Sequence, residues 1–347
     1  MAEMIKRAVL AATFIFLTSV AVSGSPAAQR LEEVISRHFL LKEGGLVSVT
    51  NPRGNIKIQS WGKDYVEVAA TKVAEGSNEE RMNKALERIR VEFVATQDSL
   101  HMKTDLGESR FKTFFLIDRI WSFFSNTRAW VDYQVWVPSE VSVLTKTASG
   151  NSSIQGIKGD VKSEGVSGKV EFFSIRGNIE ASTISGEMEL AEVEGNVNLR
   201  SRSGNMYLDQ VKGYVFARST KGKLEMNSVE GTIRGLTVSG KIVMRKIKGV
   251  VELAETTRGD IETEVVEVAD DWLGMIFCSV SGDIEVSLPR DLGANLGIKT
   301  VSGRISCEFT ISTRGQFEPG TLGGPINGGG PLLEIETTDG DIFVRQI

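Results

Sequence analysis

Residues 186–222 read GEMELAEVE-GNVNLRSRS-GNMYLDQVK-GYVFARSTK-G, with a glycine at every ninth place. The same spacing extends through a longer stretch of the chain: Gly150, Gly159, Gly168, Gly177, Gly186, Gly195, Gly204, Gly213, Gly222, Gly231, Gly240 and Gly249. A fixed period of this kind is typical of repeat proteins, in which each unit packs only on its neighbours. The repeat therefore decides the fold of this chain.

The true unit has eighteen residues, because two kinds of nine-residue segment alternate. In one half the glycine closes a Ser/Thr-x-Ser-Gly phrase, as in Thr183–Gly186 and Ser201–Gly204. In the other half it follows an apolar and a charged residue, as in Val193-Glu194-Gly195. The two halves are therefore expected to form different sides of one turn.

Apolar residues fall at the second and fourth places after each glycine and again two places before the next, as Met188, Leu190 and Val193 do after Gly186. This period of two indicates strands, which we expect to be short and to end at each glycine. The residues between the apolar ones are predicted to face solvent: Glu187, Glu189, Asn205, Tyr207, Lys241 and Val243.

A nine-residue strand cannot bury its apolar side alone, so the units must coil and stack. The predicted fold is all-β, a single-stranded parallel β-helix or solenoid with 18-residue turns made of two nine-residue halves, plus one N-terminal helix excursion. Inward residues are bulky in the Ser-Gly half: Phe172, Leu190, Leu208, Met226 and Met244. They are small in the other half, which predicts a wedge-shaped cross-section: Ser163, Ala181, Ala217 and Gly235.

Residues 1–28 have a positive start, an apolar run from Ala8 to Val22 and a small-residue end, which predicts a secretory signal peptide. The alternative is a retained membrane anchor, although the run is short for a span. No cysteine follows the run, which argues against a lipid anchor. We expect export to the periplasm or the cell surface.

Residues 29–137 are predicted to form a first rung around Gly54-x-Ile56-x-Ile58, a helix from Ser77 or Asn78 to about Arg90, and an aromatic insertion, which together cap the solenoid. Residues 138–347 are the predicted repeat domain. Its regular spacing loosens from Gly259, with loops expected at 268–275 and 315–330, and a last strand from Leu332 to Ile347 is expected to close the rod.

The aromatic insertion at 110–130 has no clean helical stripe. Solenoids need their open ends covered, so one interpretation is a lid over the end of the core. The other is an exposed patch that contacts a membrane or a partner protein, for which the candidate residues are Phe111, Phe114, Phe115, Trp121, Phe123, Phe124 and Trp130.

We expect neither a cofactor nor a metal ion. Calcium-binding nine-residue repeats carry aspartate two places after glycine, whereas this chain has Val161, Met188 or Ile242 there, so no calcium is expected. The only histidines, His38 and His101, lie outside the repeat, and the carboxylates are scattered, so no enzyme is predicted. The net charge of −5 gives a nucleic-acid partner no electrostatic support.

Two further features of the repeat remain open. Cys278 and Cys307 permit a disulfide in an oxidising compartment, but they lie on opposite sides of a corner, so two buried thiols are at least as consistent with the sequence. Charged residues recur at one place in successive turns, which predicts either a stabilising ladder or a track for a ligand: Lys158, Arg176, Glu194, Lys212, Glu230 and Lys248.

The order of the phrases resembles the exported DUF4097 "putative adhesin" family of bacteria. Asn51-x-x-Gly-Asn-Ile-x-Ile comes first, then Tyr133-x-Val-x-Val-Pro138, then repeated Ser-Gly-x-Ile phrases, Leu288-Pro289, and a closing Thr-x-x-Gly340-Asp-Ile. The resemblance covers roughly residues 46–347 and implies an envelope location and a β-solenoid. The aromatic insertion is not part of that pattern.

The sequence thus predicts an exported, non-enzymatic β-solenoid that acts as an adhesin-like binding or scaffold protein of the bacterial cell envelope. Its expected partners are an envelope protein, a glycan or a membrane surface. The alternatives are a carbohydrate-active β-helix enzyme and a self-assembling structural rod.

Overall fold

A computed structural model describes residues 14–18, 29–107, 127–312 and 318–347 of the chain. It divides into two compact parts, unit 1 (Met1–Gly168) and unit 2 (Lys169–Ile347), each of which is described by itself. Most of the described residues lie in strands, and there is one helix among them.

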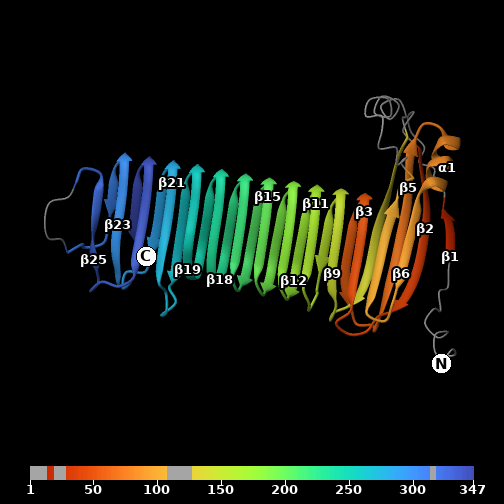
Figure 1. The fold of residues 1–347 in the computed structure, drawn as a ribbon, viewed down its shortest axis with the longest axis horizontal. Helices are drawn as coiled ribbons and strands as arrows, with labels where there is room; N and C mark the ends of the chain where they lie inside the picture. The colour runs from red at the N-terminus through yellow and green to blue at the C-terminus, as the bar shows by residue number, and fades with distance from the viewer. Residues whose placement is uncertain (1–13, 19–28, 108–126, 313–317) are drawn as a thin grey trace. The chain divides into compact units, whose positions relative to one another are not determined.

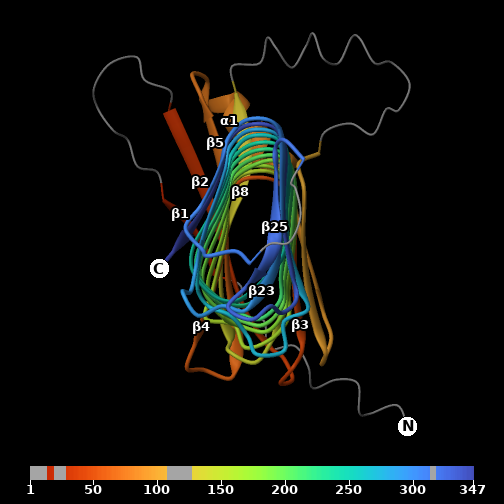
Figure 2. The same ribbon diagram turned by 90° about the vertical axis from the view of Figure 1, so that its left-hand side faces the viewer.

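Unit 2 is a parallel β-solenoid. Val170 pairs with Met188 and Met188 with Met206, so each step through the regular turns is 18 residues, which confirms the predicted fold class; the step lengthens later, to 23 residues between Ile261 and Ile284. Figure 1 shows the strands stacked side by side, and Figure 2 shows successive turns overlaid. The strands are β12 (Val170–Arg176), β13 (Ile179–Ser185), β14 (Met188–Glu194), β15 (Val197–Ser203), β16 (Met206–Lys212), β17 (Val215–Lys221), β18 (Leu224–Ser239), β19 (Ile242–Arg258), β20 (Ile261–Glu267), β21 (Gly274–Ser281), β22 (Ile284–Leu288), β23 (Ala294–Ser302), β24 (Ile305–Cys307), β25 (Thr321–Ile326), β26 (Leu332–Asp339) and β27 (Ile342–Gln346).

The corner glycines of successive turns lie in columns. A Cβ atom on Gly213 would be 2.5 Å from the carbonyl oxygen of Gly195 in the preceding turn, and the φ of Gly213 is 138°. No other residue combines this backbone with the absence of a side chain. The nine-residue spacing therefore records a backbone approach that only glycine allows.

The interior follows the predicted wedge. Ala217 is buried, and in the next turn Gly235 lies opposite the ends of long side chains. A Cβ on Gly235 would be 3.5 Å from Cε of Met244 and 3.7 Å from Cε of Met226. Small residues of one half thus make room for the bulky residues of the other.

In the later turns, the first residue of the four-residue segment that ends in glycine donates its hydroxyl to a glycine carbonyl of the preceding turn, whereas the hydroxyls of Thr147, Thr183 and Ser201 have no hydrogen-bond partner in the described part of the chain. The hydroxyl of Thr256 donates to the carbonyl of Gly240 in the preceding turn at 3.2 Å, and that of Ser279 donates to Gly259 at 3.1 Å. Buried carbonyls need a donor, so the hydroxyl satisfies a group that the corner would otherwise leave unpaired. This contact was not predicted.

Two predictions about regular strands are wrong. β18 runs through Gly231 and β19 through Gly249, so the strands do not end at every glycine. Val243 is 1% exposed, although its place alternates outward. Its in-register neighbours are Glu225 and Glu262, whose ion-paired side chains cover the smaller valine.

The last strands do not close the stack as predicted. β26 lies between β21 and β23, and β27 lies between β22 and β24, so the C-terminal turn is inserted one turn from the end. Asp283 accepts the backbone N–H of Asp341 at 2.8 Å, and Asp341 accepts that of Arg304 at 2.8 Å. The Arg304 side chain has no acceptor for the backbone N–H of a further turn, so arginine fits the last position in this row of corner residues.

The segment predicted as a glycine-rich loop at 315–330 contains β25, which pairs antiparallel with β23. Residues 313–317 lie outside the described residues. β25 includes Pro325, which has no N–H to donate to another strand. The loop predicted at 268–275 is present as far as Leu273.

Unit 1 contains two sheets, each of which has parallel strands on one side and antiparallel strands on the other. One sheet has the order β1-β2-β5-β8-β4-β10, and the other has β6-β7-β3-β9-β11. The bounds are β1 (Phe14–Thr18), β2 (Gln29–Leu40), β3 (Leu46–Arg53), β4 (Ile56–Trp61), β5 (Tyr65–Gly76), β6 (Arg90–Ala95), β7 (Ser99–Asp105), β8 (Arg128–Pro138), β9 (Ser142–Ser149), β10 (Ser152–Gln155) and β11 (Val161–Ser167). Ile56 and Ile58 are buried in the predicted first rung.

The predicted helix is α1 (Glu79–Arg88). The side chain of its N-cap, Asn78, accepts the backbone N–H of Arg81 at 2.9 Å, as expected for an N-cap. Met82 and Leu86 are buried, and the helix packs mainly on β5.

The predicted signal peptide lies mostly outside the described residues, apart from β1, which pairs antiparallel with β2. No helix in the described ranges is long and apolar enough to cross a membrane.

Replacing Gly213 with alanine should lower the free energy of unfolding by about 1–3 kcal/mol, because the new Cβ meets a backbone carbonyl in a strained conformation. Denaturant unfolding followed by circular dichroism measures the change. The matched control is Gly235→Ala, since Ala217 already occupies that place one turn earlier. Equal losses in the two variants would contradict the role of the corner column.

Acidification should loosen the terminal turn. The N–H groups of Arg304 hold the pKa of the Asp341 carboxyl below its usual value, so the stabilisation is present above the unfolded pKa and is lost as pH falls through the folded one. The protection factor of the Arg304 amide, which is its exchange rate relative to that of an unprotected amide at the same pH, should fall over that range. Asp341→Asn keeps an acceptor that does not titrate, so it should remove this dependence; an unchanged dependence would point to another group.

Candidate functional site

A kinked corner recurs in five successive turns of unit 2. The residue six places after every second glycine of the repeat has a left-handed backbone there, with φ between 53° and 57°: Ser174, Glu192, Gln210, Ser228 and Lys246. A residue with a side chain costs about 1–2 kcal/mol in this conformation. The kink returns the next residue to the core, as Val193 and Val229 show with no exposed surface.

The kinked corners line a groove of about 500 Å³. One row of lining residues is the left-handed set, and another is the charged ladder, with buried valines between them. The lining residues are Ser174, Arg176, Glu192, Val193, Glu194, Gln210, Lys212, Ser228, Val229, Glu230, Lys246 and Lys248. Each turn therefore contributes a polar or charged side chain to each row.

The charged row is paired along the stack. The distance from Arg176 to Glu194 is 3.4 Å, that from Lys212 to Glu230 is 3.4 Å, and that from Lys248 to Glu267 is 3.7 Å. These charged side chains are at least 57% exposed, so each pair is worth no more than about 1 kcal/mol. The predicted pairing of opposite charges is confirmed for Lys212 and Glu230, and the charged groups remain accessible.

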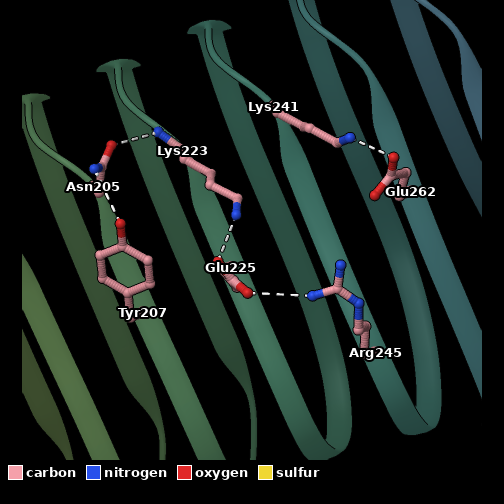
Figure 3. A network of polar contacts seen from close by, with 7 residues as sticks. All are labelled: Asn205, Tyr207, Lys223, Glu225, Lys241, Arg245 and Glu262. Carbon is pink, nitrogen blue, oxygen red and sulfur yellow. Dashed lines mark hydrogen bonds and ion pairs between the residues drawn. The ribbon is translucent and has the colours of Figure 1, made fainter.

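The open face of the Ser-Gly half carries a second network (Figure 3). Lys223 lies 2.6 Å from Glu225, and Glu225 lies 3.2 Å from Arg245. The Lys223 ammonium is the main reason that the pKa of Glu225 lies below its usual value. In the preceding turn Asn205 donates to the hydroxyl of Tyr207 at 3.1 Å. The face is thus a lattice of charged and planar polar groups.

Four charges gather at the start of that face. Lys169 lies 2.7 Å from Glu189, 2.8 Å from Glu171 and 3.9 Å from Glu187. Burial raises the pKa of Glu187, whereas the hydrogen bond from Lys169 lowers that of Glu189. Such a split is the feature expected of an acid–base pair. All four side chains are nevertheless 33–44% exposed, so a substrate there would not be shielded from water.

The sequence pattern of this chain matches that of a known protein family. A family model described as Toastrack DUF4097 matches residues 47–345. The chain belongs to this family. A search of curated proteins found no match.

Several solved structures are similar to this Toastrack chain. One is a putative cell adhesion protein from Clostridium sporogenes, which is 10% identical; the match covers 92% of this chain and 100% of that protein, with a TM-score of 0.22. A putative adhesin from Bacteroides fragilis has 11% identity, coverages of 90% and 97%, and a TM-score of 0.29. A putative lipid-binding protein from Parabacteroides distasonis has 10% identity, coverages of 90% and 96%, and a TM-score of 0.29.

Of the predicted contact residues, six lie outside the described residues: Phe111, Phe114, Phe115, Trp121, Phe123 and Phe124. Trp130 lies on β8, where its Nε1 donates to Asp132 at 2.9 Å and the Arg30 guanidinium is 5.8 Å from its ring. A membrane or partner contact by the aromatic segment stays a prediction.

The cysteines of the Toastrack chain are both free, so the disulfide is not formed. Burial raises the pKa of Cys278 to about 11, which keeps it protonated and unreactive near neutral pH. In the part of the chain that the structure describes, no three His, Cys, Asp or Glu side chains come together as metal ligands would.

Sequence reasoning found the charged row but missed the left-handed row and the groove between them. Its residues are Ser, Glu, Gln, Ser and Lys, and none is a Gly or Asn that would indicate a left-handed backbone. Their only shared signal is a polar residue six places after every second glycine of the repeat: Gly168, Gly186, Gly204, Gly222 and Gly240.

Lys212→Glu should lower the stability of the stack by at most about 1 kcal/mol in low salt, because it places like charges beside Glu194 and Glu230. The loss should shrink in high salt, as screening weakens the repulsion. Thermal unfolding at two salt concentrations measures both effects. Lys212→Arg keeps the charge and should leave stability unchanged; a salt-independent loss would indicate a packing effect instead.

Proposed function

We propose that this Toastrack protein is an exported, non-enzymatic β-solenoid that acts as an adhesin-like binding or scaffold protein of the bacterial cell envelope. The observation that carries the proposal is the corner groove, in which two rows of polar side chains repeat over five turns above an apolar floor.

A groove built by stacked turns suits an extended ligand. Its groups recur at the strand spacing of about 4.8 Å, so a linear partner can make one similar contact with each turn. Each contact is weak at an exposed surface, but several on one rigid frame act together. Both charge signs alternate along the groove, which accommodates a hydroxyl-rich glycan or an extended protein segment.

The proposed export rests on the sequence of residues 1–28, whose apolar run follows Lys6 and Arg7.

The cluster around Lys169 favours the alternative of a carbohydrate-active enzyme, since Glu187 and Glu189 differ in pKa direction. Binding is preferred because these carboxylates lie on an open sheet face, where their shifts follow from the neighbouring ion pairs. The alternative of an end-to-end rod is disfavoured by β25, whose antiparallel direction and Pro325 interrupt the stacking pattern at one edge of unit 2.

A sedimentation assay tests the proposal. The purified full chain should co-sediment with isolated bacterial envelopes. The test variant replaces three charged residues of the groove: Glu194→Ser, Lys212→Ser and Glu230→Ser. It should bind at least about tenfold more weakly, which corresponds to about 1.4 kcal/mol. Localisation is measured separately by fractionating cells that produce the full chain.

The matched control removes one cation and two acids from the open face: Lys169→Ser, Glu171→Ser and Glu189→Ser. It should bind like the wild type. Binding that survives in the groove variant would overturn the role of the groove. Release of sugar fragments from the envelopes that stops in Glu187→Gln would overturn the non-enzymatic assignment.

A further inference from the structure

Four exposed cations gather on the outward face of the other half of unit 2. Arg200 and Arg202 lie on β15, and Arg218 and Lys221 lie on the neighbouring strand β17. We call these four residues the basic patch. The chain as a whole carries a net charge of −5, so the patch does not follow from a basic composition.

The arrangement places like charges side by side. Arg200 and Arg218 are in register on adjacent strands, about 4.8 Å apart. Like charges directly opposite one another destabilise a sheet. The same place holds Ser182 one turn earlier and Leu236 one turn later, so the repeat does not require arginine there.

Ten other cations of unit 2 lie within 4 Å of a carboxylate, whereas Lys246, Arg258, Arg290 and Lys299 have no ion pair in the described ranges but are not gathered in one place; the ten are Lys169, Arg176, Lys212, Lys223, Arg234, Lys241, Arg245, Lys248, Arg304 and Arg345. In the described ranges, Arg202, Arg218 and Lys221 have no such ion pair. Arg200 contacts only neutral groups there: its Nε donates to Asn198 at 3.2 Å, and its guanidinium is 5.5 Å from the ring of Phe216. The basic patch therefore keeps most of its donors free for an anion.

We propose that the basic patch binds an anionic polysaccharide through its carboxylate groups. A guanidinium presents two parallel N–H donors that match a carboxylate, and three of the four cations are arginines. A polyuronate carries one carboxylate on each sugar ring, so a short run of it meets several of these cations at once. Phe216, half-buried next to Arg200, offers an apolar surface to a sugar ring.

This inference deepens the proposed function by naming a class of ligand. It rests on that function only for the cellular location, the envelope, in which the protein would encounter the ligand. The basic patch lies on strands β15 and β17, whereas the groove is lined by residues from the other strands of the turn and their corners. The two surfaces can therefore fail separately.

Affinity electrophoresis of the full chain in gels containing polygalacturonate, with neutral dextran as the reference, tests the proposal. The wild type should be retarded only by polygalacturonate, and less so as salt is added. Arg200→Ser with Arg218→Ser should weaken binding about tenfold or more, which corresponds to about 1.4 kcal/mol. Serine already occupies this place in the preceding turn at Ser182, so the variant should fold; its unfolding temperature checks this.

The matched control removes the same charge from two exposed cations elsewhere in unit 2, Arg290→Ser with Lys299→Ser. Equal weakening in this control, or no retardation of the wild type, would overturn the proposal. So would binding to phosphatidylglycerol vesicles, but not to polygalacturonate, that depends on Arg200 and Arg218. If the wild type fails to bind polygalacturonate but still sediments with envelopes, the proposal for the basic patch is wrong and the proposal for the groove still stands.

Discussion

The structure depends on one close contact, that between the backbones of corner glycines in adjacent turns. The carbonyl of one glycine occupies the space in which the next would carry its Cβ. Stacking at strand spacing brings the backbones together at the two corners that lie nine residues apart, so glycine recurs at both, whereas the kinked corner between them holds other residues. Hydroxyl groups such as those of Thr256 and Ser279 then satisfy the carbonyls that the corners bury.

This constraint leaves the outer positions free to vary. The interior needs only glycine corners and alternating apolar side chains, so the outward residues can carry any charge pattern without changing the frame. Unit 2 uses that freedom differently on its three surfaces. The open face is internally neutralised, the groove alternates in sign, and the basic patch concentrates one sign. The proposed binding role requires such a rigid support, on which separate surfaces can differ while the frame stays the same.

The repeat made the core and the 18-residue turn predictable, because inward places such as Met188 and Met206 follow from periodicity alone. Val243 could not be predicted as buried, since its cover comes from long side chains on neighbouring turns. The left-handed corners could not be predicted from the sequence, because the residues that form them, such as Glu192, are not ones that favour this backbone. They adopt it because the next residue, such as Val193, is buried in the core. The groove, which depends on those corners, was therefore missed, although its charged row was found.

The position of β26 and β27 has a consequence for synthesis on the ribosome. The final turn occupies a slot between two turns made earlier, so this end of the sheet cannot be completed in the order in which the residues emerge. The β23–β24 turn must wait unattached, or be displaced, until residues 332–346 have been made. A chain without these residues would thus carry an internal gap rather than a shorter stack, so this part of the sheet assembles only after they have left the ribosome.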